Sequence, residues 1–122
     1  MKFFFKIISL VYLILISISF LIPLDLFVIK KIVEVENIPN NNEAYLIHFF
    51  IFLILFVLFN YSFNSIYKVL IFCLIYSFII EIFQIFTSRG FQISDIFFNL
   101  IGVFVPFIFF FLRNLINYKK KK

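Results

Sequence analysis

The sequence predicts an all-α integral membrane protein, folded as a bundle of four transmembrane helices with both termini in the cytoplasm. The first observation is composition, because 65% of the 122 residues are hydrophobic and 14% are charged, whereas soluble domains are roughly half apolar and about a quarter charged. The second is that the apolar residues form four runs, each near the roughly 20 residues that cross a bilayer. Helices are expected because lipid offers no partner for open strand edges.

The four predicted spans lie in a single membrane domain of residues 1–122 and cover about residues 7–28, 44–60, 66–86 and 93–112. The first run follows Lys2 and Lys6, as the apolar part of a signal peptide would. We keep it as a span because it is long and no cleavage site with small residues follows it.

Basic residues flank the predicted spans unevenly. Eight lie on one side: Lys2, Lys6, Lys68, Arg113 and the four lysines at 119–122. Three lie on the other: Lys30, Lys31 and Arg89. Because loops rich in Lys and Arg stay in the cytoplasm, this count predicts an N-in/C-in topology, with an outer loop at 29–43 and a basic cytoplasmic tail at 113–122. The net charge of +5 then reflects orientation in the membrane, and no nucleic-acid partner is predicted.

Polar residues gather at the predicted outer ends of three spans. They are His48 in the second span, Glu81 and Gln84 in the third, Asp95 and Asn99 in the fourth, and Arg89 in the loop between the last two. Helical spacing places Ser77, Glu81 and Gln84 on one face of the third span, and Asp95 and Asn99 on one face of the fourth. Because an ionisable side chain costs about 2.5–3.5 kcal/mol near the centre of a membrane helix, this gathering predicts a polar pocket that opens outward.

Arg89 is the natural partner of the carboxylates, because a guanidinium binds a carboxylate through two hydrogen bonds. We expect it to pair with Glu81 or Asp95. Gln84 and Asn99 would then satisfy the remaining donors and acceptors. The candidate binding residues are therefore His48, Glu81, Gln84, Arg89, Asp95 and Asn99. The alternative is a polar clamp that only holds the third and fourth spans together.

Two further residues of the fourth span bear on its packing. Gly102 continues the polar face of this span and is expected to let it approach a neighbour closely, which brings the polar faces together. Pro106 is expected to kink the same span further along.

In their order along the chain, these residues resemble the VanZ-like family. The matching elements are His48-Phe49, Glu81-x-x-Gln84, Arg89, Ser94-Asp95-Ile96 and Asn99-x-x-Gly102, within residues 44–110. The chain departs from the family pattern at Ala44-Tyr45, where the family often has Asp-Lys, and at Pro106, where it often has glycine. The resemblance implies a multi-pass protein of the bacterial cell membrane. The family is named for a member that confers low-level resistance to the glycopeptide antibiotic teicoplanin.

Three functions are open at this point. The first is an outward-facing pocket that binds an envelope lipid headgroup or a cell-wall precursor, which the resemblance connects with teicoplanin susceptibility. The second is a membrane-embedded hydrolase or transferase in which Glu81 or Asp95 is the general acid or base and His48 assists. No nucleophile motif marks the chain, so catalysis stays open. The third is a structural helper of other membrane proteins. Membrane lipid is the expected partner, and the short chain is compatible with homo-oligomers.

No metal or other cofactor is predicted. His48, Glu81 and Asp95 are residue types that bind metal ions. However, the chain has a single histidine, and these residues do not follow the clustered spacing of a metal-binding motif.

Overall fold

The computed structural model describes residues 2–22, 41–87 and 92–120, apart from the side chains of residues 41–43 and 87. Four long helices make up most of this part of the chain: α1 (Lys2–Leu21), α3 (Asn41–Ser62), α4 (Ile66–Gln84) and α5 (Ile93–Lys119). A short 3₁₀ turn, η1 (Ile85–Thr87), continues α4. All four helices are long and apolar enough to cross a membrane, which confirms the predicted all-α bundle of four spans.

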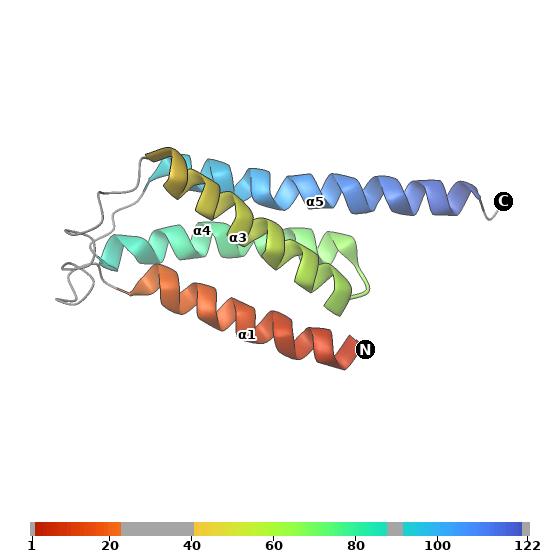
Figure 1. The fold of residues 1–122 in the computed structure, drawn as a ribbon, viewed down its shortest axis with the longest axis horizontal. Helices are drawn as coiled ribbons and strands as arrows, with labels where there is room; N and C mark the ends of the chain where they lie inside the picture. Colours follow the sequence, from red (N-terminus) through yellow and green to blue (C-terminus); the bar gives the residue numbers. More distant parts are fainter. Residues whose placement is uncertain (1, 23–40, 88–91, 121–122) are drawn as a thin grey trace.

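The helices run alternately up and down, so that consecutive helices are antiparallel (Figure 1). Both termini lie at one end of the bundle, and α5 projects beyond the other helices there. The start of α3, the end of α4 and the start of α5 lie at the opposite end. We call this opposite end, which carries His48, Glu81, Asp95 and Asn99, the polar end. Which side of a membrane it faces stays a prediction from the basic residues.

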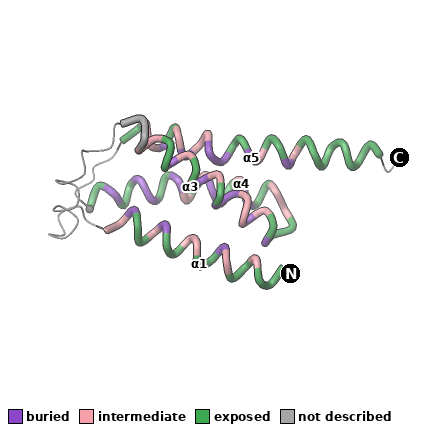
Figure 2. The backbone as a smooth tube through the Cα atoms, in the orientation of Figure 1, coloured by how far each residue is buried: buried purple, intermediate pink, exposed green. Residues whose placement is uncertain are grey.

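Helix α3 lies at the centre of the packing. It contacts α5 most extensively and also contacts α1 and α4. Its side chains Phe52, Leu55 and Phe56 are fully buried, and Figure 2 shows buried positions on the inner side of each helix. These residues hold the helices together by close packing, because lipid tails are as apolar as the side chains themselves.

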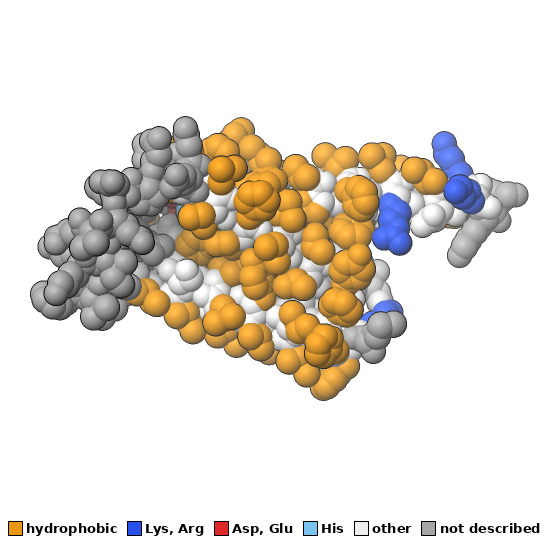
Figure 3. Space-filling view, in the orientation of Figure 1, with side chains coloured by type: hydrophobic (Ala, Val, Ile, Leu, Met, Phe, Trp, Pro, Cys, Tyr) orange, Lys and Arg blue, Asp and Glu red, His pale blue; other side chains and the backbone are white. Residues whose placement is uncertain are grey.

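The outer surface is apolar over most of its height. On the face drawn in Figure 3, hydrophobic side chains cover the helices as far as the basic side chains near the termini. The described basic residues are exposed and all belong to the end with the termini: Lys2, Lys6, Lys68, Arg113, Lys119 and Lys120. This distribution is typical of a lipid-facing belt with one basic end.

Three helices extend beyond the predicted spans. Helix α1 begins at Lys2, α3 begins at Asn41 inside the predicted outer loop, and α5 continues to Lys119 inside the predicted basic tail. Hydropathy marks the part of a helix that lies in hydrocarbon, whereas backbone hydrogen bonding continues into the interface, where Lys and Arg reach water. The predicted end of the first span and most of the outer loop, residues 23–40, lie outside the described residues.

Helix α5 continues through Pro106 as one nearly straight helix, so the expected kink is not seen there (Figure 1). Proline has no N–H to donate to the carbonyl of Gly102, four residues earlier. Pro106 is buried, and packing against neighbouring helices allows a membrane helix to tolerate the missing hydrogen bond.

Helix α1 is held by polar contacts that the sequence analysis did not find. The hydroxyl of Ser9 shares a hydrogen bond with that of Ser62 on α3. The hydroxyl of Ser17 lies 2.9 Å from that of Tyr76 on α4. Ser9 and Ser17 lie about two turns apart in an otherwise apolar helix. This pattern could have indicated which face of α1 packs against its neighbours, because hydroxyls in membrane helices bond across interfaces.

Candidate functional site

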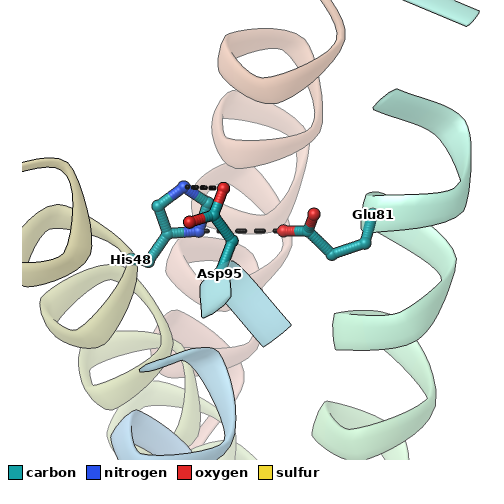
Figure 4. Close-up of side chains that lie close together, drawn as sticks. All are labelled: His48, Glu81 and Asp95. Atoms are coloured by element: carbon teal, nitrogen blue, oxygen red, sulfur yellow. Dashed lines mark ion pairs between the residues drawn. The ribbon is translucent and has the colours of Figure 1, made fainter. Parts of the chain in front are cut away.

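Four polar side chains from three helices meet at the polar end. His48 comes from α3, Glu81 from α4, and Asp95 and Asn99 from α5. Glu81 and Asn99 are fully buried, and His48 is 8% exposed. The Asp95 side chain is 14% exposed. Figure 4 shows that the three ionisable side chains point toward one another, with a marked contact from the imidazole to each of the two carboxyl groups. The expected meeting of these residues is therefore present in the structure.

Asn99 connects the other groups through both ends of its amide. Its Nδ2 donates to Glu81 Oε1 at 3.3 Å, and its Oδ1 lies 3.0 Å from His48 Nδ1. Because the amide nitrogen already faces the carboxylate, the amide oxygen faces the imidazole and accepts from Nδ1–H. A single side chain of α5 thereby joins α3 to α4.

The second nitrogen of His48 faces Asp95. With Nδ1 as the donor, Nε2 of a neutral imidazole carries the free electron pair. Nε2 lies 3.6 Å from Asp95 Oδ2, which is too long for a direct hydrogen bond. Two acceptors therefore face each other across a short gap, and such a gap is where a bridging proton, water molecule or cation binds.

Glu81 is the most deeply buried ionisable group of the site. Its Oε1 accepts from Asn99, and the backbone N–H of Gln92 also interacts with the carboxyl group. Its Oε2 has no hydrogen-bond partner among the described residues. The hydroxyl of Ser77, one turn earlier on α4, is also buried without a partner in that part of the chain. Buried polar atoms are normally satisfied, so these two atoms indicate where a further group can bind.

Aromatic rings pack beside the polar groups. Phe20 of α1 lies against the imidazole of His48, with the two ring centroids 4.9 Å apart. Tyr45 of α3 stacks on Phe98 of α5 with centroids 4.7 Å apart and a 6° interplanar angle. Because Phe20 is itself buried, it closes the α1 side of the site. Sequence reasoning missed this contact, since a phenylalanine among so many carries no distinguishing pattern.

Gly102 lies one turn beyond Asn99, where α5 comes closest to α3. A Cβ at this position would clash with the backbone oxygen of Phe49 and would lie 3.1 Å from Cβ of Phe52. The close approach expected at Gly102 is present, and the helix that it approaches is α3. Because Phe49 follows His48 directly, this approach also brings His48 within reach of Asn99.

Two of the predicted binding residues remain to be placed. Gln84 is buried on the same face of α4 as Glu81. Arg89 lies outside the described residues. Its expected pairing with Glu81 or Asp95, and the outward-opening pocket to which it would contribute, therefore stay predictions. Within the described ranges, neither carboxylate forms an ion pair with a Lys or Arg side chain.

Comparison with protein families confirms the family that the sequence resembles. The family model described as VanZ/LLP1 matches residues 3–114, which include all or most of each helix. The chain belongs to the VanZ/LLP1 family. No curated protein and no solved structure gives a significant match. The protein is therefore a VanZ-family membrane protein with four apolar helices. The match begins in α1, so it covers more of the chain than the motifs at residues 44–110 did.

Proposed function

We propose that this VanZ-family protein binds the polar headgroup of an envelope lipid, or of a lipid-linked cell-wall precursor, in the bacterial cell membrane. One observation supports the proposal most: four polar side chains from three helices meet at one end of an otherwise apolar bundle, namely His48, Glu81, Asp95 and Asn99. A ligand that moves within the bilayer would find hydrogen-bonding partners at this end.

A ligand is favoured over a purely structural clamp because the polar groups do not satisfy one another fully. A clamp stabilises a bundle when its members form complete hydrogen bonds across the helices. Here Glu81 Oε2 lacks a partner among the described residues, and His48 Nε2 faces Asp95 across 3.6 Å. Ionisable groups left open in this way are costly inside a membrane, and they mark functional sites by default.

The depth of the site fits a lipid headgroup. Asp95 lies in the first turn of α5, and His48 lies about 10 Å from the start of α3 at about 1.5 Å per residue. Both are near the level at which hydrocarbon gives way to headgroups. With the predicted N-in/C-in topology, this end would face the cell exterior. Altered susceptibility to teicoplanin is the cellular effect that we include in the proposal.

The test compares deletion cells that express wild-type protein, Glu81→Gln, Asp95→Asn or the control Ile82→Ala, which changes an exposed neighbour of Glu81. Each purified protein is also incubated with a total lipid extract of the host, and retained lipids are identified by mass spectrometry. We expect the two site variants to lose lipid binding about tenfold or more, as for a lost hydrogen bond to a charged group. Their teicoplanin phenotype should weaken in parallel, and the control should match the wild type.

Two outcomes would contradict headgroup binding. One is unchanged lipid retention and teicoplanin susceptibility in both site variants at wild-type abundance. The other is a fall in the abundance of both variants, with normal lipid retention per molecule. The second outcome would support a structural helper of other membrane proteins.

A membrane-embedded hydrolase or transferase is the second candidate. It is favoured by the closeness of His48 to two carboxylates, with Nδ1 3.8 Å from Glu81 Oε1 and Nε2 3.6 Å from Asp95 Oδ2. In this arrangement Glu81 or Asp95 can act as the acid or base with the imidazole as its partner. Lipid extracts of cells with and without the protein discriminate the two candidates. A new or lost lipid species indicates catalysis, whereas identical extracts with retained lipid indicate binding.

A further inference from the structure

We infer that the polar end holds a divalent transition-metal cation such as Zn²⁺ or Mn²⁺, bound by His48, Glu81 and Asp95. The inference rests on the proposed function for its role, because the ion would make a site with two carboxylates attractive to a phosphate headgroup. One ligand atom from each residue lies within 4.8 Å of the others. Imidazole is a common ligand of Zn²⁺, and carboxylates bind both ions.

Asn99 already orients the imidazole as a metal ligand. A metal-binding histidine donates its second ring N–H to an oxygen acceptor, which fixes the tautomer and the ring orientation. Here Nδ1 of His48 lies 3.0 Å from Asn99 Oδ1. The free electron pair is therefore on Nε2, which Figure 4 shows on the side of Asp95.

The distances are close to those that one ion requires. Two ligands of a tetrahedral ion lie about 3.4 Å apart when each bond is about 2.1 Å. His48 Nε2 and Asp95 Oδ2 are 3.6 Å apart, so this pair needs only a small adjustment. The carboxyl group of Glu81 lies on the other side of the ring, with Oε1 3.8 Å from His48 Nδ1, so it must turn toward Nε2 to share the ion.

The carboxyl group of Glu81 gives an independent indication of a bound cation. Glu81 is 0% exposed, and Figure 4 shows its carboxyl group directed at His48. Asn99 occupies Oε1, while Oε2 has no hydrogen-bond partner in the part of the chain that is described. Buried charges in proteins are paired or bind metal ions. A cation would satisfy Oε2 and both carboxylates together.

The remaining coordination position identifies the class of lipid. Three protein ligands leave at least one position of a tetrahedral ion for an outside donor. The Asp95 side chain is partly exposed, so this position can face the headgroup layer. Two carboxylates alone repel a phosphate, whereas a bound divalent cation attracts it. We therefore assign phosphate-bearing headgroups as the ligands of this site.

The test uses the full chain, purified in detergent through a tag without histidine, because His48 is its single histidine. After treatment with EDTA and dialysis, the protein is titrated with Zn²⁺ or with Mn²⁺, and metal per chain is measured by mass spectrometry. We expect the wild type to bind one ion per chain. Asn99→Leu should weaken affinity about 10–100-fold, and His48→Ala and Glu81→Gln should weaken it further. The exposed neighbour Ile47→Ala should bind like the wild type.

The inference is overturned if the wild type binds neither ion, or if His48→Ala and Glu81→Gln bind as tightly as the wild type. If either variant loses helicity by circular dichroism, Asp95→Asn replaces it, because Asp95 is the least buried ligand. Retention of short-chain phosphatidylglycerol is then measured with and without EDTA. Equal retention in both conditions overturns the metal role and leaves headgroup binding intact. Metal binding without retention of any lipid supports the metal site and contradicts the proposed function.

Discussion

Replacing Gly102 by alanine is expected to destabilise the bundle, although the same change stabilises most helices. Alanine gains up to about 1 kcal/mol over glycine in a helix interior. At Gly102, however, the added Cβ would clash with the backbone oxygen of Phe49 and lie 3.2 Å from the backbone nitrogen of Leu53. Overpacking of this kind typically costs about 1–3 kcal/mol. Backbone atoms cannot avoid the new methyl group by rotating, so the upper part of that range applies and a net loss of about 1–2 kcal/mol is expected.

The assay for Gly102→Ala is reversible unfolding in mixed micelles by titration with sodium dodecyl sulfate, followed by circular dichroism. Gly102→Val should lose more stability than Gly102→Ala, because valine adds two further methyl groups at the same contact. Val105→Ala, an exposed position of α5, is the control and should stay within about 0.5 kcal/mol of the wild type. A Gly102→Ala protein as stable as the wild type would refute the close approach of α3 and α5 at this residue.

Two further predictions follow from the same structure. Asn99→Leu should lose about 1–2 kcal/mol of stability in that unfolding assay, since two interhelical hydrogen bonds are worth about 0.6 kcal/mol each and both partners stay buried; wild-type stability would contradict the bridge. The predicted topology is tested with a membrane-impermeant maleimide applied to intact cells, which should label Gln92→Cys and not Asn64→Cys. The native Cys73 is buried and should give no background labelling. The reverse labelling would contradict the predicted orientation.

The fold could be predicted because each span needs only a run of apolar residues of sufficient length. This requirement is local, so the sequence located all four helices. The ends of α1 and α5 differ from the prediction because helical hydrogen bonding does not stop where hydropathy does: Lys2 and Arg113 are helical although they lie outside the predicted spans. The order of packing around α3 was not predicted, because lipid-facing and helix-facing positions carry the same apolar residues.

The candidate site was predicted as far as helical spacing determines it. Spacing placed Glu81 and Asn99 on the polar faces of their helices, and both are fully buried there. It could not show that the amide of Asn99 joins His48 to Glu81, because that depends on the relative rotation and height of three helices. The same limit applies to Phe20, whose contact with His48 depends on where α1 docks.

Gly102 and Asn99 together explain how a polar site can form inside such an apolar bundle. Gly102 lets the backbones of α3 and α5 approach, and Asn99 uses that approach, one turn away, to form a 3.0 Å contact with His48. The second donor of the same amide then holds Glu81 of α4 in place. The two contacts of Asn99 orient the His48 imidazole and the Glu81 carboxyl group, and each leaves a further electron pair of that side chain unused. The residues that assemble the three helices are therefore also those that leave His48 Nε2 and Glu81 Oε2 available to a ligand.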